Sequence, residues 1–144
     1  MKYTQGTIGR VFLVKFEDKD VLREKIEELV CKEKIKTATI IFLGALRGGT
    51  LIAGPKKAVI PPVPNSVLYR DGWEVMGIGS VFSGDKGPQI HIHVSMGKKQ
   101  KTLVGCVRDS AKTFLVLEAV ILELRGVKAS KGIDPSTGLN VLRI

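Results

Sequence analysis

The segment Gln89–Met96 alternates apolar and polar residues without a break, and this alternation most constrains the fold. A period of two is typical of a β-strand with one face in the core and the other in solvent. The predicted core face consists of Ile90, Ile92, Val94 and Met96. Both histidines of the chain therefore project from the opposite face, which carries Gln89, His91, His93 and Ser95.

One segment has the period of an amphipathic helix instead. Asp18 and Asp20 are candidate N-caps, and the helix is predicted to continue to about Lys34. Its apolar residues fall on one helical face, and charged residues fill the rest. These apolar positions are Val21, Leu22, Ile26, Leu29 and Val30. We interpret the charged face as solvated surface.

Short turns separate a series of segments rich in β-branched and aromatic residues, which predict strands. These segments are Arg10–Phe16, Thr37–Leu43, Thr50–Ala53, Trp73–Phe82 and Thr102–Val107. The segment Phe114–Leu124 fits either a helix or a doubly buried strand, and its β-branched content favours the strand. Gly48 and Gly49 predict a turn. Strands joined by short turns pair antiparallel.

Together these elements predict an α+β fold. We expect a single domain over residues 1–144, with six to eight strands in a mainly antiparallel sheet and one main amphipathic helix. The longest apolar run, Ala38–Leu46, is too short to span a bilayer, so no membrane partner is expected. Cys31 and Cys106 lie far apart without a Cys-x-x-Cys motif and are expected to be buried, reduced thiols. These features favour a soluble, cytoplasmic protein.

The charge of the chain is strongly positive, because 23 Lys and Arg residues outnumber 14 Asp and Glu residues and leave a net charge of +9. Such an excess attracts polyanions such as DNA, and it is also common on the Lys-rich surfaces of thermophilic proteins. Six lysines that fall in predicted turns are candidate phosphate contacts. They are Lys56, Lys57, Lys86, Lys98, Lys99 and Lys101. No helix-turn-helix, zinc-finger or aromatic RNA-binding motif accompanies them.

The two histidines are the best candidates for a chemical site. Imidazoles at His91 and His93, on one strand face, are close enough to bind one metal ion, or they form a polar surface pair without a ligand. The sequence has no third histidine. A metal would need further ligands from water, a neighbouring subunit, or the candidates Glu74, Asp85 and Asp109. Ser95 lies on the same face, but no orienting carboxylate supports a nucleophile there.

These residues also carry a resemblance to a known family. The chain resembles the plant and prokaryote conserved (PPC) domain, which occurs alone in prokaryotes and after AT-hooks in plant nuclear proteins. The resemblance rests on Arg10 before the helix and on four later segments in a fixed order. The segments are Phe42–Leu46, Trp73–Ser80, Gln89–Gly97 followed by Val104–Gly105, and Asp134–Leu139.

The resemblance implies a homotrimer, and its prokaryotic members are commonly described as predicted DNA-binding proteins. The Arg-Gly-Arg-Pro core of the plant AT-hook is absent from this chain. We therefore expect a homotrimeric PPC-domain protein that contacts DNA through its basic turns and is a binding protein rather than an enzyme. The alternative is a trimer, an enzyme or a binding protein, that holds a small ligand or a metal. In this alternative His91 and His93 lie near a cleft between subunits.

Some prokaryotic members of the family resemble metal proteins with a third histidine after two glycines. In this chain the matching position falls at about Val107, which cannot bind a metal. The neighbouring Cys106 could, but adjacent residues of a strand point to opposite faces, so Cys106 is expected to point away from the histidines. A divalent metal such as zinc is therefore possible but not favoured by the sequence.

Overall fold

A computed structural model of the chain describes residues 1–108 and 110–144. Asp109, one of the candidate metal ligands, lies outside the described residues. The elements follow one another as β1 (Thr7–Phe16), α1 (Leu22–Lys32), β2 (Thr37–Pro55), β3 (Pro64–Gly84), β4 (Gly87–Lys98), β5 (Lys101–Val107), β6 (Lys112–Arg125), β7 (Ser130–Ile133) and β8 (Asn140–Arg143). The α+β class, with a mainly antiparallel sheet and one helix, is confirmed.

The sheet is organised around the long strands β2 and β3, which pair with each other along most of their length. The inner half of β2 also pairs with β6, which in turn pairs with β1. On the other side, β3 pairs with β4 and β4 with β5, and β5 returns to the outer half of β2 through Leu51 and Ile52. Among the pairings of the described strands, the one between β7 and the end of β3 is the only parallel one.

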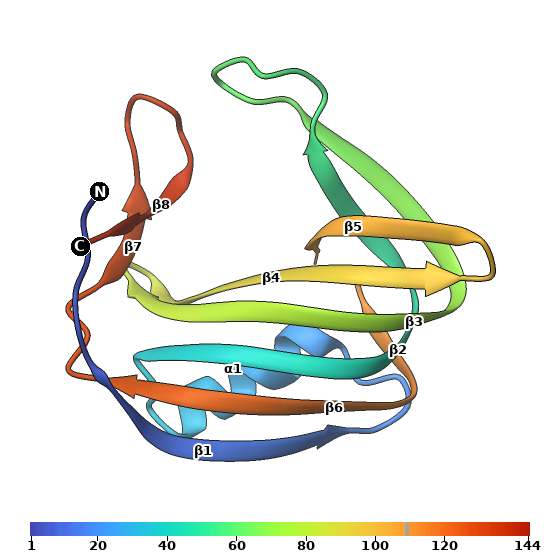
Figure 1. Ribbon diagram of the computed structural model, residues 1–144, viewed down its shortest axis with the longest axis horizontal. Coiled ribbons are helices and arrows are strands. Elements are labelled where there is room, and N and C mark those ends of the chain that lie inside the picture. The colour runs from blue at the N-terminus through green and yellow to red at the C-terminus, as the bar shows by residue number, and fades with distance from the viewer. Residues whose placement is uncertain (109) are drawn as a thin grey trace.

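The core lies between the sheet and α1, which packs against one sheet face (Figure 1). The helix buries its predicted apolar face through Leu22, Ile26 and Val30. On the strand side, β4 turns Ile90, Ile92, Val94 and Met96 into this core, as its alternation predicted. No helix in the described parts of the chain is both long enough and apolar enough to cross a membrane.

The predicted helix boundaries were wrong at both ends. The N-cap position is Val21, which offers no side-chain oxygen, and the helix begins at Leu22. Asp18 instead accepts a hydrogen bond from the Leu115 backbone N–H and forms an ion pair with Arg47 of β2. At the other end Lys34 has a φ of 54°, a left-handed conformation that follows the end of the helix.

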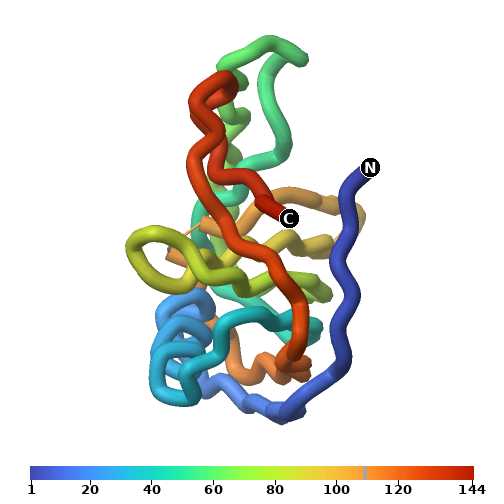
Figure 2. The backbone as a smooth tube through the Cα atoms, turned by 90° about the vertical axis from the view of Figure 1, so that its left-hand side faces the viewer, coloured from blue at the N-terminus to red at the C-terminus, as the bar shows by residue number. Residues whose placement is uncertain are grey.

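The turn predicted at Gly48 and Gly49 was also wrong, because the chain passes through both glycines inside the single strand β2. Their φ angles of 58° and 150° lie in the region that glycine tolerates best, and the register with β3 shifts between Arg47 and Gly49. The glycines therefore bend the strand without reversing it. This bend directs the outer halves of β2 and β3 away from the body as a hairpin (Figures 1 and 2).

Three further expectations can be compared with the structure. Phe114–Leu124 is a strand, as preferred, with Leu117, Ala119 and Ile121 buried in β6. Strands β7 and β8 were not predicted, because each has only four residues. Cys31 is exposed near the end of α1, which contradicts the expectation that both thiols are buried.

Candidate metal centre and basic turns

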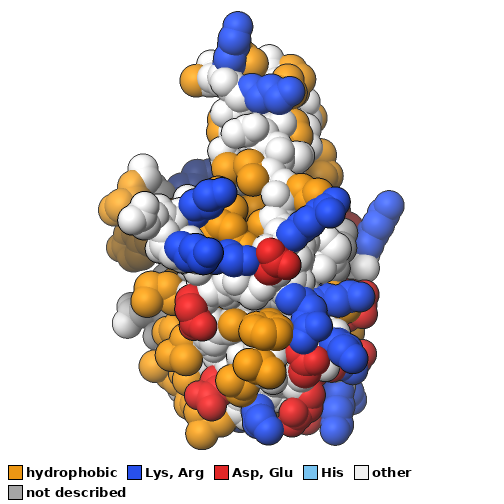
Figure 3. All heavy atoms as spheres, turned by 90° about the vertical axis from the view of Figure 1, so that its right-hand side faces the viewer, with side chains coloured by type: hydrophobic (Ala, Val, Ile, Leu, Met, Phe, Trp, Pro, Cys, Tyr) orange, Lys and Arg blue, Asp and Glu red, His pale blue; other side chains and the backbone are white. Residues whose placement is uncertain are grey.

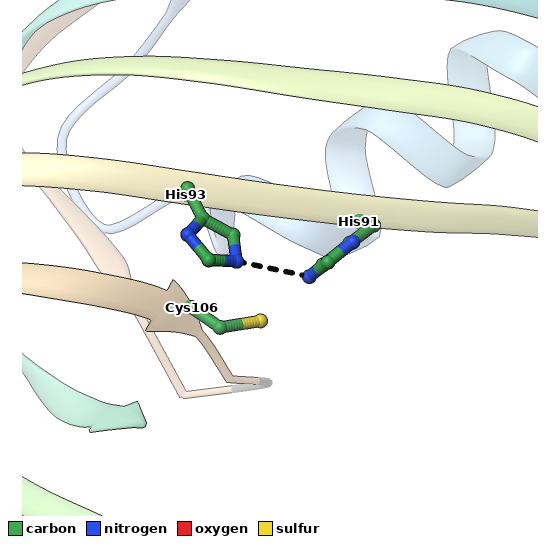
Figure 4. A group of neighbouring side chains, drawn as sticks. All are labelled: His91, His93 and Cys106. Atoms are coloured by element: carbon green, nitrogen blue, oxygen red, sulfur yellow. Dashed lines mark hydrogen bonds between the residues drawn. The ribbon is translucent and has the colours of Figure 1, made fainter. Parts of the chain in front are cut away.

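His91 and His93 project from the same face of β4 and lie side by side, as the alternation predicted (Figure 4). Their Nε2 atoms are 3.1 Å apart. The ring centroids are 4.8 Å apart and the planes meet at 78°, so both ring nitrogens are directed toward one small volume. The rigid strand fixes this arrangement, because neither histidine is on a loop.

Cys106 completes the cluster from β5. The Cα atoms of Cys106 and His93 are partners in the antiparallel register, and side chains of such partners lie on the same face of a sheet. The prediction that Cys106 points away from the histidines was therefore wrong. The ligand atoms of His91, His93 and Cys106 all lie within 4.8 Å of one another, and Cys106 is only 6% exposed. Val107 points into the core instead.

The surroundings of the cluster disfavour the charged form of His91. Burial lowers the pKa of His91, and the positive charges of Lys131, His93 and Arg108 lower it further. Lys131 reaches this neighbourhood from β7, where burial lowers the pKa of its own amine. Because a neutral imidazole is the form that binds a metal, the surroundings favour the ligating state. Nothing in the sequence pattern indicated that Lys131 or Arg108 would approach His91.

The donor set of two imidazole nitrogens and one thiolate suits Zn²⁺. Ligand distances for tetrahedral zinc require neighbouring nitrogen and sulfur donors to be roughly 3–4 Å apart. The three donor atoms meet this requirement with only small movements of their side chains. They leave the fourth coordination position for water or another ligand, as in catalytic zinc sites.

The other candidate ligands are not part of this cluster. Asp85 lies in the turn between β3 and β4, and Glu74 pairs with Gly97 at the far end of β4. Ser95 follows His93 on the same face, where both line a shallow apolar depression with Val104. Among the described residues, His91, His93 and Cys106 form the one group of three metal-binding side chains.

The six candidate lysines occupy three separate places. Lys98, Lys99 and Lys101 lie at the β4–β5 turn. With Arg70 they line a concave surface that encloses a volume of about 1080 Å³. Lys98 forms an ion pair with Asp71 at 3.0 Å. The remaining lysines lie elsewhere: Lys56 and Lys57 follow β2 at the end of its hairpin with β3, and Lys86 lies in the β3–β4 turn. Arg70 was not anticipated as part of a basic surface.

Strand β4 separates the two turns that it connects. Lys86 precedes the start of β4 and Lys98 ends it, so one subunit does not bring all six lysines into a single patch. On the face shown in Figure 3, Lys and Arg side chains are interspersed with Asp and Glu around the middle of the molecule. The concave surface at the β4–β5 turn holds three of the six candidate lysines, more than either of the other two places.

The fold and the site together define a small α+β sheet domain with a candidate metal centre on one sheet face. The Plants and Prokaryotes Conserved (PCC) domain matches residues 3–125, so the chain belongs to this family, also called PPC. The family resemblance in the sequence is thereby confirmed. No curated protein matches the chain.

Several solved structures are similar over nearly the whole chain. A metal-containing protein from Archaeoglobus fulgidus has a TM-score of 0.87 at 24% identity and is covered, like this chain, over 100% of its length. A PPC protein from Pyrococcus horikoshii has a TM-score of 0.84 at 23% identity, covering 100% of this chain and 98% of that one. A candidate DNA-binding protein from Bacteroides thetaiotaomicron has a TM-score of 0.78 at 16% identity, covering 97% and 98%. At these identities the similarity establishes the fold.

Proposed function

We propose that this chain is a metal-binding PPC-domain protein that holds a Zn²⁺-class ion at His91, His93 and Cys106. The convergence of three donor atoms within 4.8 Å is the observation that carries the proposal. The similar Archaeoglobus fulgidus protein is described as metal-containing, which supports the same interpretation. The proposal revises the sequence-based expectation, in which the metal was not favoured because Cys106 was expected on the other face.

Each residue has a distinct part in this site. His91 and His93 would bind through Nε2 as neutral donors, and Cys106 would bind as a thiolate through Sγ. A bound zinc ion supplies a Lewis acid with one open position. Lys131 and Arg108 place positive charge near His91 and favour an anionic ligand at that open position. These features allow a small-ligand site, without defining a reaction.

Elemental analysis tests the metal site directly. The purified protein, loaded with Zn²⁺ and dialysed, should hold about one equivalent per chain. The variants His91→Ala and Cys106→Ser should fall to background, while Ser95→Ala, from the same strand face, should retain the metal. With Co²⁺ in place of Zn²⁺, thiolate charge-transfer absorption should appear in the wild type and be absent from Cys106→Ser. Less than a tenth of an equivalent in the folded wild type would exclude the site.

A second candidate function is DNA binding through the basic surface at the β4–β5 turn. The supporting observation is the gathering of Lys98, Lys99, Lys101 and Arg70 on one concave surface of a chain with a net charge of +9. The similar protein from Bacteroides thetaiotaomicron is described as a candidate DNA-binding protein. Contacts of this kind read phosphates and carry little sequence information.

The salt dependence of DNA affinity tests this function. The wild type should shift duplex DNA at low salt, and its affinity should fall steeply as salt rises. Replacing Lys98, Lys99 and Lys101 by Ala should reduce the slope of log K against log salt by about three. A control that removes the same charge from the exposed residues Lys2, Lys32 and Lys36 should leave the slope nearly unchanged. Absence of any shift at low salt would reject DNA binding.

We further propose the homotrimer that the family resemblance implies, with the sheet face opposite α1 as the interface. Five apolar side chains on this face are between 50% and 67% exposed: Ile41, Leu43, Met76, Ile78 and Val104. A continuous apolar face of this kind is a typical interaction surface. Three copies, each with a charge of +9, repel one another, so apolar burial has to drive the association.

Light scattering tests the assembly. A mass of three chains is expected for the wild type, and Ile78→Glu should dissociate it because the charge would be buried in the interface. Ile133→Glu is the matched control, because Ile133 is 56% exposed on β7, a strand outside the five-residue apolar face. A wild-type monomer at micromolar concentration would contradict the proposed trimer.

A further inference from the structure

We propose that the tip of the β2–β3 hairpin, residues 56–63, wedges its apolar side chains at a base step of duplex DNA while its lysines contact the flanking phosphates. This inference rests on the DNA-binding function proposed above. It adds a second contact point, separate from the β4–β5 turn, and a physical consequence, which is a bend in the DNA. Three features of the hairpin carry it: its projection, its composition and its charge.

The hairpin projects from the body as a paired ribbon. The outer halves of β2 and β3 pair from Gly49 opposite Tyr69 to Pro55 opposite Pro64, with one register shift between Ile52 and Pro55. Both backbone views show it extending away from the sheet and α1 (Figures 1 and 2). Lys56 donates a backbone hydrogen bond to the Val63 carbonyl at 2.8 Å, which closes the base of the tip. The structure therefore presents the tip on a defined support.

The tip has aliphatic side chains that are half or more exposed. Val59 and Val63 are each 50% exposed, and Ile60 is 73% exposed. Pro61 follows Ile60 and is also exposed. Apolar residues gathered at the end of a projecting ribbon are poorly placed to stabilise the fold, because they touch little of the core. Their position is explained if they contact another molecule.

The charge of the hairpin identifies that molecule as a polyanion. Lys56 and Lys57 directly precede the apolar residues, and no Asp or Glu occurs from Gly48 to Arg70. In Figure 3 the tip carries only basic, apolar and neutral side chains. A second copy of this chain has the same net charge of +9, so it attracts the two lysines less than a polyanion does. A polyanion with an apolar interior satisfies both kinds of side chain.

Duplex DNA has this combination of properties. Its phosphates attract lysines, and proteins that kink DNA insert Ile, Leu, Met, Phe or Pro between base steps from the minor groove. Ile60 and Pro61 belong to the residue types that act as such wedges. Proteins that bind DNA through β-ribbons place strands in either the major or the minor groove. It does not offer the broad apolar face by which amphipathic helices enter a bilayer.

The experiment measures DNA bending and affinity with the full chain. The probe is a short duplex with a central TA step, which unstacks easily, and fluorophores on its two ends report the bend by energy transfer. The wild type should bring the ends closer together. Ile60→Ser should abolish most of this change while keeping the salt slope. Lys56→Ala with Lys57→Ala should reduce the salt slope by about two.

Two controls match these variants. Ile133→Ser removes another exposed isoleucine, from β7, and Lys32→Ala with Lys36→Ala removes the same charge from the other end of the molecule. Both should bend and bind DNA like the wild type. Because the tip lies outside the core, the tip variants should fold, and circular dichroism with sizing verifies this.

The outcomes separate this inference from the function on which it rests. If the wild type does not bind the duplex at low salt, DNA binding fails and the wedge fails with it. If the β4–β5 lysine variants weaken binding but the wild type leaves the duplex straight, only the wedge is rejected. The wedge is also rejected if Ile60→Ser dissociates the oligomer. It is likewise rejected if Ile60→Ser alters binding to anionic phospholipid vesicles but leaves the bending of the duplex unchanged.

Discussion

Cys106 of β5 lies directly opposite His93 of β4, and this pairing decides which residue can complete a metal site. In an antiparallel sheet, opposed residues share a face and the next residue along points to the other. Cys106 therefore faces the two imidazoles, while Val107 faces the core with a side chain that is 5% exposed. Cys106 therefore lies where the third histidine of the family would be needed, one residue before Val107, the position that the sequence indicated.

A histidine should support metal binding at position 106 and not at position 107. We expect Cys106→His to retain about one equivalent of Zn²⁺, because an imidazole replaces a thiolate on the correct face. Adding Val107→His to Cys106→Ser should not restore binding, and it should lower stability because a polar ring enters the core. Elemental analysis with urea unfolding measures both effects. Restoration of the metal by Val107→His would show that the register is wrong.

Metal binding and trimer assembly should be coupled. A cross-strand row of Leu13, Val120, Ile41, Ile78, His93 and Cys106 runs from β1 to β5 on one sheet face. If this face is the proposed interface, a neighbouring subunit covers the metal site, so each event stabilises the other. Chelation of the metal should therefore shift the trimer toward monomers on dilution, as followed by light scattering.

The control for this coupling is a variant without the site. His91→Ala should have the same oligomeric state with and without chelator. If chelator dissociates His91→Ala as strongly as the wild type, its effect does not act through the cluster. An unchanged wild-type trimer after complete removal of zinc would reject the coupling.

Gly77 should be intolerant of a side chain. A Cβ atom there would clash with the Phe42 ring and lie 2.8 Å from the His93 carbonyl oxygen. Gly77→Ala should lower the free energy of unfolding by about 1–3 kcal/mol or more, because the buried ring and the strand cannot both move away. Gly97→Ala is the control, since no atom lies within 4 Å of its Cβ position, and it should change stability by no more than about 0.5 kcal/mol. Urea unfolding compares them.

Glu123 should make stability depend on acid pH. Its pKa falls from the ordinary 4.5 to about 2, mainly because Arg10 donates a side-chain hydrogen bond to it, and Arg125 adds positive charge. A lowered pKa means that the folded state favours the carboxylate. The resulting stabilisation is complete well above pH 4.5 and is lost as the pH falls toward 2.

The comparison of wild type with Glu123→Gln isolates this effect. The difference in free energy of unfolding between them should shrink steadily from pH 6 to about pH 2, as measured by urea titrations. Glu118→Gln is a control from the same strand, because Glu118 is exposed. A difference that is constant across this range would mean that the Arg10 pair does not hold the charge of Glu123.

Local pattern predicted much of the sheet. The alternation of Gln89–Met96 placed both histidines on one face, and β-branched content correctly favoured a strand at Phe114–Leu124. The position of Cys106 could also have been predicted from the sequence, because a turn centred on Lys99 and Gln100 places Cys106 opposite His93. The family alignment, which indicated Val107, led away from this geometric signal.

The sequence by itself determined the periodicity of each element, the family and the charge, because these depend on neighbouring residues. Tertiary structure decided the rest. Gly48 and Gly49 bend β2 because its partner β3 continues alongside them, which no local pattern reports. Lys131 approaches His91 only because β7 joins the end of β3. The metal cluster likewise depends on register between strands, where one residue of displacement moves a ligand to the opposite face.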